Sequence, residues 1–313
     1  MSRIKIIPRS ATPNGKSMVA TLPKDYTDLA IRAHDQVVTL TQMHPRTAAM
    51  YELLMSDAAL GAHWNLSNYT TVNKLGYNDH GPIHAQVTAS YSMQMMTLLV
   101  AAGVPFDVVE SGAGDSLDDA FLVTLAGILL HDIGNSLHRT NHEAMGVILA
   151  ERILSRTLPK IYPDIEQQTL ISDFILSAVQ CHDMNPNPLF MECALVAVAD
   201  GCDMTKGRAR MPFDLGKIDI HAVSALSIEE VNIKTGQGIP VEIEVLMSNS
   251  AGIFQVEQTL VGKLVKTPLV RYVTVRATVV DRFDQFDHAG TDKRIIDSVM
   301  LRDGRLQPVQ RKV

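Results

Sequence analysis

The sequence has little of what several protein classes require. Its 313 residues include three cysteines, an odd number without a CxxC spacing, which argues against a disulfide framework or a cysteine-ligated zinc site and favours a reducing compartment. The net charge is −6, so the basic excess of a general nucleic-acid binder is missing. The longest strongly apolar run, residues 122–130, is too short to cross a bilayer, and the N-terminus lacks the apolar core of a signal peptide. We therefore expect a cytoplasmic protein that binds neither membranes nor nucleic acid.

What the sequence does contain is a long helical region. Apolar residues recur near the helical period, and proline or Asp-Ser pairs stand where helices can begin. Helices are predicted over residues 26–57, with a new start at Pro45, and over 82–102, 117–132, 142–155, 164–181 and 189–204. The polar and aromatic stretch 61–79 is predicted to be a loop, and Gly134 to end the buried helix before it in a left-handed conformation.

The sequence pattern changes from helical to strand-forming after residue 222. Residues 225–233 and 241–247 predict strands, 251–266 a helix, and 270–280 a half-buried strand, with Asp303-Gly304 as a hairpin turn. The predicted fold class is therefore mainly α: a helical domain over residues 1–222, then a small α+β module with β-β-α-β order over 223–313. Exposed strand edges of this module can pair with another subunit, so we expect a homo-oligomer.

Histidines and aspartates gather at the ends of the predicted helices. His131 and Asp132 directly follow a buried apolar helix, where a relaxed last turn lets both side chains address one metal. His84, His142, His182 and Asp200 stand near the ends of other helices. Such nitrogen-rich ligands suit Fe, Mn, Co or Zn better than Mg or Ca. Six ligands are too many for one catalytic metal, so we predict two divalent ions that share Asp132 as a bridge.

The order H…HD…H…H…D over residues 75–212 resembles the dinuclear variant of the HD-domain superfamily of phosphohydrolases, which the HD-GYP cyclic-dinucleotide phosphodiesterases share. HDIG is a common form of the name-giving pair, here His131-Asp132. The resemblance implies a helical HD domain and metal-ligand roles for the residues that match its motif: His84, His131, Asp132, His142, His182 and Asp200. In the family, the last ligand aspartate is often followed by an aspartate three residues later and then by basic residues. Asp203, Lys206 and Arg208 or Arg210 match that pattern.

Two departures refine the resemblance. The lysine that follows HDIG in HD-GYP proteins is Asn135 here, and no GYP tripeptide is present, which argues against cyclic-di-GMP as substrate. The segment HGPIHA instead places His80 four residues before His84, and it resembles the HNxxHA start of mammalian cyclic-nucleotide phosphodiesterases. In those enzymes the first histidine donates a proton to the leaving oxygen. We therefore predict His80 as the catalytic acid, because residues four apart share one helix face.

Together these features predict a phosphohydrolase or phosphodiesterase that acts on a nucleotide or another small phosphorylated molecule. A hydroxide bridging the two metals is expected to attack phosphorus. Lys206 is expected to neutralise the negative charge that builds at the phosphate during hydrolysis. The predicted phosphate-binding residues are Arg139, Lys206, Arg208 and Arg210. Two alternatives stay open. An HD-fold di-iron oxygenase uses the same ligand order, and a metal-binding regulatory protein needs the site only for structure.

Overall fold

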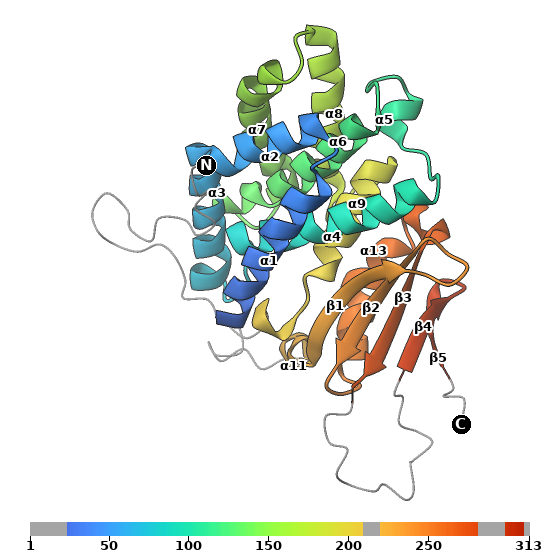
Figure 1. Ribbon diagram of the computed structural model, residues 1–313. Helices are drawn as coiled ribbons and strands as arrows, with labels where there is room; N and C mark the ends of the chain where they lie inside the picture. The colour runs from blue at the N-terminus through green and yellow to red at the C-terminus, as the bar shows by residue number, and fades with distance from the viewer. Residues whose placement is uncertain (1–23, 209–219, 281–297, 310–313) are drawn as a thin grey trace, which may run out of the picture.

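A computed structural model describes residues 24–208, 220–280 and 298–309. Figure 1 shows a body of helices with a five-stranded sheet on one side of it. This confirms the predicted class, a mainly helical bundle followed by a small α+β module. The helices of the body are α1 (Lys24–Leu40), α2 (Pro45–Ser56), α3 (Ala58–Asn68), α4 (Pro82–Ala101), α5 (Asp107–Glu110), α6 (Leu117–Leu130), α7 (His142–Thr157), α8 (Ile165–Cys181), α9 (Met191–Cys202) and α11 (Ile220–Leu226).

Helix α6 forms the centre of the body. All its residues from 119 to 130 are buried, as expected for a helix that is apolar on every side, and it contacts α2, α4, α8 and α9. Its start is fixed by Asp119, whose carboxylate accepts hydrogen bonds from the backbone N–H of Asp115 at 2.7 Å and of Ser116 at 3.1 Å. The central helix therefore delivers His131 and Asp132, which follow it, into the interior.

Two local predictions are wrong. The stretch expected as a loop after Gly61 is helix α3, continued by a π-helical turn at Tyr69–Lys74. The signal was present, because Leu60 and Trp64 are buried four residues apart and the Asp57 carboxylate caps the helix by accepting from the N–H of Ala59 at 2.9 Å. Gly134 is not in the left-handed region either; the chain passes through a short 3-10 helix, Ile133–Ser136.

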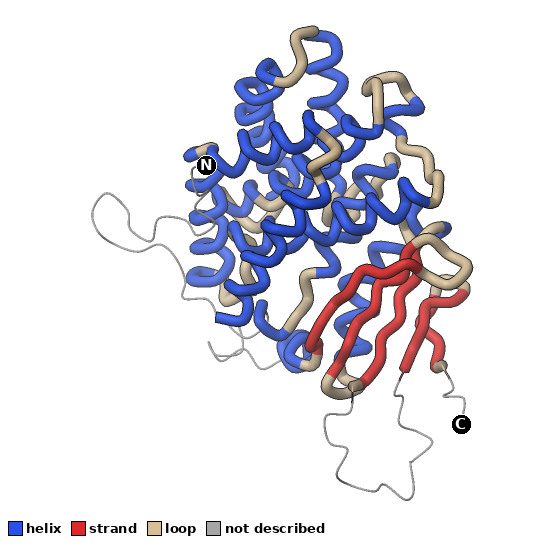
Figure 2. The backbone as a smooth tube through the Cα atoms, viewed as in Figure 1, coloured by secondary structure: helices blue, strands red, loops and turns tan. Residues whose placement is uncertain are grey.

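The C-terminal module contains the predicted β-β-α-β order and a further hairpin. Its strands are β1 (Ile228–Thr235), β2 (Val241–Met247), β3 (Val273–Val279), β4 (Ser298–Arg302) and β5 (Arg305–Pro308), side by side in chain order (Figure 2). Only β2 and β3 pair in parallel, because a helical crossover of α12 (Gly252–Gln255), a π-helical turn (Val256–Val261) and α13 (Gly262–Leu264) joins them. The hairpin turn at Asp303-Gly304 is confirmed, with φ of 50° and 75°.

The crossover of the module packs directly on the body. A Cβ atom added to Gly201, near the end of α9, would lie 2.8 Å from the carbonyl oxygen of Thr259, so only glycine allows this approach. Buried apolar side chains from both regions form one contiguous cluster. The crossover is therefore held against the end of α9, while the domain boundary at residue 222 stays a prediction. Within the described ranges, no helix combines the length and the apolar character needed to cross a membrane.

Candidate metal centre

The six predicted ligands come together in the interior. His84 lies in the first turn of α4, His131 and Asp132 directly follow α6, and His142 is the first residue of α7. His182 directly follows α8, and Asp200 lies near the end of α9. The four imidazoles are buried, and the Asp200 side chain is 15% exposed. Five helices thus each contribute an end to one cluster.

One half of the cluster is formed by His84, His131 and Asp200. The Nε2 atom of His84 lies 3.1 Å from Nε2 of His131 and 3.1 Å from Oδ1 of Asp200. Oδ2 of Asp132 faces both histidines, 3.3 Å from Nε2 of His84 and 3.2 Å from Nε2 of His131. The ligand atoms of His84, His131 and Asp200 are close enough together to hold a metal ion.

The other half is formed by His142 and His182. Their Nε2 atoms lie 3.0 Å apart. The second carboxylate oxygen of Asp132, Oδ1, faces them, 3.3 Å from Nε2 of His142 and 3.7 Å from Nε2 of His182. Asp183 completes this half, with Oδ2 3.9 Å from Nε2 of His142. Each oxygen of Asp132 therefore faces a different pair of histidines.

The outer ring nitrogens fix the direction of the inner ones. Nδ1 of His131 donates to the carbonyl oxygen of Ile128 at 2.6 Å, and Nδ1 of His182 donates to that of Val179 at 2.7 Å. A neutral imidazole that donates from Nδ1 carries a lone pair on Nε2. The inner nitrogens are thus prepared as metal ligands by the hydrogen bonds that usually orient ligand histidines. The donor set fits a divalent transition metal.

The charges of the cluster favour a bound cation. Burial alone would raise the pKa of Asp200, but Lys263 and His131 hold it well below its usual range. Burial and the Arg208 charge would lower the pKa of His84, but the surrounding carboxylates outweigh them and raise it to about 10. Burial would likewise lower the pKa of His131, but Asp132 raises it to about 9. Without metal, protons on these two histidines would supply the positive charge that the carboxylates need.

Gly134 permits the two halves to meet. A Cβ atom at this position would lie 1.9 Å from the carbonyl oxygen of His142 and 2.5 Å from the nitrogen of Gly146. The 3-10 helix that follows Asp132 therefore crosses the start of α7 with no room for a side chain. This close crossing brings His142 within reach of Asp132.

Three cations and one histidine border an opening beside the ligands. The opening has a volume of about 190 Å³, and Asp200 also lines it. The bordering side chains are His80, Arg139, Arg208 and Lys263. Arg139 reaches Nε2 of His142 at 3.0 Å and Oδ2 of Asp183 at 3.3 Å. Arg208 is buried and donates to the carbonyl oxygen of Asp79 at 2.9 Å. Two of the arginines predicted to bind phosphate thus lie at the site.

His80 faces the same opening in a defined orientation. Its Nδ1 donates to the carbonyl oxygen of Asn78 at 2.7 Å, and Nε2 makes no hydrogen bond with any residue that the structure describes. Burial lowers the pKa of His80 well below its usual value. The imidazole is therefore neutral near pH 7, with an accepting nitrogen where the sequence predicted a proton donor.

The remaining predicted basic residues are not brought to the metal centre. Lys206 pairs with Glu229 of β1, with Nζ 2.5 Å from Oε2, and lines a separate cavity between α1, α4 and β1. The structure therefore does not bring Lys206 to the metal ligands, because a carboxylate of the sheet holds its ammonium group, and its role at phosphate stays a prediction. Arg210 lies outside the described residues.

Two residues at the site were missed by sequence reasoning. Asp183 directly follows His182, and this second His-Asp pair was a usable signal. Lys263 comes from α13 in the module, where its ammonium group contacts Asp200 and donates to the carbonyl oxygen of His182 at 3.0 Å. Nothing local in the sequence around Lys263 indicates this contact. The C-terminal module thus contributes a side chain to the edge of the site.

The comparison with known proteins places the chain in a family. The uncharacterized protein MJ1020 of Methanocaldococcus jannaschii is 39% identical over 230 residues, which are 74% of this chain and 88% of the relative. The chain belongs to the MJ1020 family. No protein-family model matches it, and no solved structure does either. Because this relative is uncharacterized, membership of the family assigns no activity to the chain. The candidate metal centre is supported by the geometry of this chain's own residues.

Proposed function

We propose that the protein is a metal-dependent phosphoester hydrolase with two metals at the cluster. The observation that carries the proposal is the placement of Asp132, whose Oδ2 faces His84 and His131 while its Oδ1 faces His142 and His182. Two metal ions joined by one carboxylate are suited to clamp the attacking and leaving oxygens of an in-line displacement at phosphorus. His84, His131 and Asp200 would hold one ion, and His142, His182 and Asp183 the other.

The ligand order supports assignment to the HD superfamily. Each histidine of H…HD…H…H…D stands at a helix terminus and points inward, which is the arrangement that the resemblance implies. Asn135, at the position of the HD-GYP lysine, donates from Nδ2 to Oδ1 of Asp132 at 2.8 Å. It thus orients the bridging carboxylate and leaves positive charge to other residues.

The cations at the opening supply what a phosphoester needs. Bound at these ligands, divalent metals would lower the pKa of a water molecule and neutralise phosphate charge. Arg139 stands at the half with Asp183, Lys263 contacts Asp200 and lies 3.6 Å from Asp183, and Arg208 approaches His84, with Nη2 3.4 Å from Nε2. Fixed cations on both sides of a small opening can stabilise the charge that builds on the phosphoryl oxygens. Lys263 takes the role that the sequence assigned to Lys206.

His80 serves in this proposal as a proton shuttle. Because Nδ1 is engaged by Asn78, only Nε2 can exchange protons with groups in the opening. A neutral imidazole there accepts a proton from the attacking water and then returns it to the leaving oxygen. This order agrees with the lowered pKa of His80, whereas a resting acid would need a proton that burial removes.

The test is a chelator-free purification followed by metal analysis and a phosphoester screen. We expect Fe, Mn, Co or Zn in the wild-type chain, and hydrolysis of at least one phosphomonoester or nucleotide diester. Asp132→Asn keeps the shape of the side chain but removes the bridging charge, so metal content and turnover should both fall. Asp173→Asn, the same exchange on an exposed part of α8, is the matched control and should change neither.

Retained hydrolysis in the folded Asp132→Asn variant would contradict the proposal. The principal rival, a di-iron oxygenase, predicts oxygen uptake by the iron-loaded protein and no phosphate release. Metal content without either activity would favour a regulatory role for the centre.

A further inference from the structure

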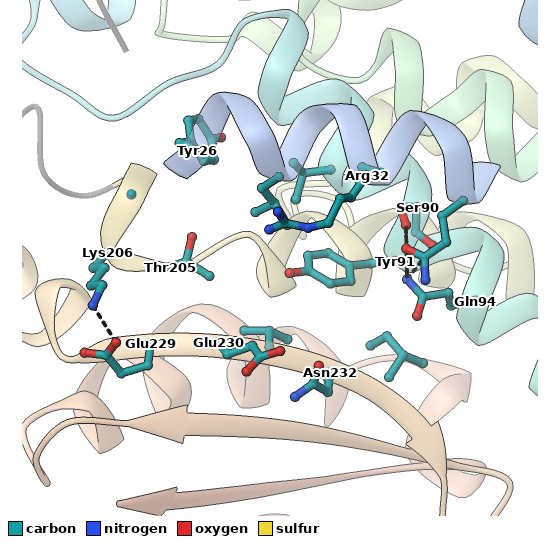
Figure 3. Close-up of a pocket in the computed structure, with 17 residues that line it drawn as sticks. Tyr26, Arg32, Ser90, Tyr91, Gln94, Thr205, Lys206, Glu229, Glu230 and Asn232 are labelled. Carbon is teal, nitrogen blue, oxygen red and sulfur yellow. Dashed lines mark hydrogen bonds and ion pairs between the residues drawn. The ribbon is translucent and has the colours of Figure 1, made fainter. Parts of the chain in front are cut away.

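A second cavity lies between the helical body and the first strand of the sheet. It has a volume of about 470 Å³ and opens between α1, α4 and β1 (Figure 3). None of the residues that line it lines the opening beside the metal ligands. Its size lies in the range of small-molecule sites, about 300–1,000 Å³. The cavity is thus a space separate from the metal centre.

Tyr91 of α4 presents an unsatisfied hydroxyl group to this space. Its side chain is 6% exposed, and its hydroxyl makes no hydrogen bond within the part of the chain that the structure describes. Figure 3 shows the hydroxyl pointing into the cavity between α1 and β1. Buried hydroxyl groups normally have a partner, so this one is prepared for a ligand or for solvent within the cavity.

The charges around Tyr91 are divided between the two walls. Arg32 of α1 lies on one side, and it forms no ion pair with any described residue. Glu230 of β1 lies on the other side and is likewise unpaired among those residues. Burial and the Asp203 carboxylate raise the pKa of the Tyr91 phenol most, Glu230 raises it further, and Arg32 lowers it. The neighbouring Lys206 is already held by Glu229, so Arg32 is the cation that remains available.

Amide side chains and an apolar wall complete the lining. Asn232 of β1 and Gln94 of α4 also line the cavity, and because Nδ2 of Asn232 donates to Glu244 at 3.3 Å, their amide oxygens are the groups left to accept from a ligand. Gln94 already bonds Ser90, with Nε2 3.1 Å from Oγ, which fixes its position at the rim. Val87 and Ile233 add apolar surface. The mixture of a few convergent polar groups with apolar walls is typical of sites for organic molecules.

We propose that this cavity binds a small organic anion that also carries hydroxyl or amino groups. The anionic group pairs with Arg32, a hydroxyl or amino group of the ligand donates to Glu230, and the Tyr91 hydroxyl bonds the ligand between them. The ligand is bound and not turned over, because none of the clustered metal-ligand residues reaches the cavity. The site is separated from the metal centre by a shared wall, in which Tyr26 of the cavity donates to Oδ2 of Asp203 at 2.8 Å.

The experiment is calorimetric titration of the full chain with four probes: AMP, glucose 6-phosphate, citrate and, as a bare anion, inorganic phosphate. It is performed in the Asp132→Asn background, in which metal content and turnover at the metal centre should fall, and repeated in the wild-type chain in case that variant fails to fold. We expect at least one organic anion to bind more tightly than inorganic phosphate. Arg32→Gln should weaken it roughly 10-fold or more and Tyr91→Phe about 5-fold.

The matched control is Arg271→Gln, which removes an exposed arginine far along the chain and should leave binding unchanged. Failure of all three organic anions to bind, or binding that is indifferent to both cavity variants, would overturn the proposal. Because the titrations do not require hydrolysis, this outcome is distinct from failure of the proposed metal-dependent activity.

Discussion

Lys263 of the C-terminal module forms an ion pair with Asp200 of the helical body, at the edge of the metal centre. The contact crosses 63 positions of sequence. Asp200 and Asp183 raise the pKa of Lys263 against the effect of burial, which would lower it, so its ammonium group stays charged. The module therefore contributes a permanent cation to a site whose candidate ligands all come from the body.

Replacement of this cation should impair turnover more than binding. Lys263→Met is expected to lower kcat by about 100-fold, in the range seen when a preorganised charge at a transition state is removed, with a smaller change in KM. Steady-state kinetics on the best phosphoester from the screen measures both constants. Lys263→Arg keeps the charge and should recover part of the loss.

The control for this prediction is Lys266→Met, an exposed lysine three residues further on. It removes the same charge from the same segment without touching Asp200. Equal turnover by Lys263→Met and Lys266→Met would show that the ion pair is only structural.

Metal binding should strengthen as pH rises. In the metal-free protein the carboxylates raise the pKa of His84 to about 10 and of His131 to about 9, despite burial, so a metal must displace both protons at neutral pH. We expect release of on the order of two protons at pH 7, and an affinity that increases up to about pH 9–10. Calorimetry in buffers of different ionisation enthalpy counts the protons. A pH-independent affinity would contradict this assignment.

The same shifts set the stability of the metal-free chain. Both folded-state pKa values lie above the ordinary value of 6.5, so the protonated imidazoles stabilise the folded state. This contribution is fully present below about pH 6.5 and is lost as pH rises through about 9 and 10. Thermal unfolding of the chelated protein should therefore occur at lower temperature at pH 9.5 than at pH 6.5, and saturating metal should remove most of the difference.

Six of the candidate ligands, all except Asp183, could be predicted from the sequence because each one lies at or near a helix end. His131 interrupts an apolar run, His142 follows a left-handed Asn141 with φ of 58°, and Asp200 is charged within an apolar helix. Burial of such polar and charged side chains in a core costs free energy unless a partner, such as a metal ion or an opposite charge, stabilises them there. Local pattern and hydrophobicity were therefore enough to find them.

The cations could not be found in the same way. Lys206 follows the ligand Asp200 closely in the sequence and so matched the family's basic residues. In the structure it forms an ion pair with Glu229 of the sheet instead. Lys263 reaches the site only because Gly201 lets the crossover approach α9, a packing relationship that has no local signature. Tertiary contacts decide which of many surface-prone side chains turn inward, and periodicity alone does not encode them.

Gly134 should be intolerant of any side chain. In Gly134→Ala the new Cβ would lie 1.9 Å from the carbonyl oxygen of His142, so the 3-10 helix and α7 must separate. We expect a loss of about 3 kcal/mol or more in unfolding free energy and weaker metal binding, because Asp132 and His142 move apart. Chemical denaturation and metal titration measure the two effects.

Gly61→Ala is the control for this substitution. Gly61 lies inside α3 with no atom within 4 Å of an added Cβ, so alanine should be neutral or stabilise the helix by about 0.5 kcal/mol. Equal stability of the two variants would mean that the close crossing at Gly134 relaxes without cost.

Asp203 should control metal affinity without being a ligand. Its buried carboxylate accepts from Nδ1 of His84 at 2.7 Å and from the hydroxyl of Tyr26 at 2.8 Å, so it holds His84 with Nε2 toward Asp132. Both bonds go to Oδ2; Asp203→Asn removes the charge and replaces one carboxylate oxygen with a donor, and we expect roughly 10-fold weaker metal binding. Asp173→Asn should bind metal like the wild type, and circular dichroism should show both variants folded. Unchanged affinity in a folded Asp203→Asn protein would mean that α4 alone orients His84.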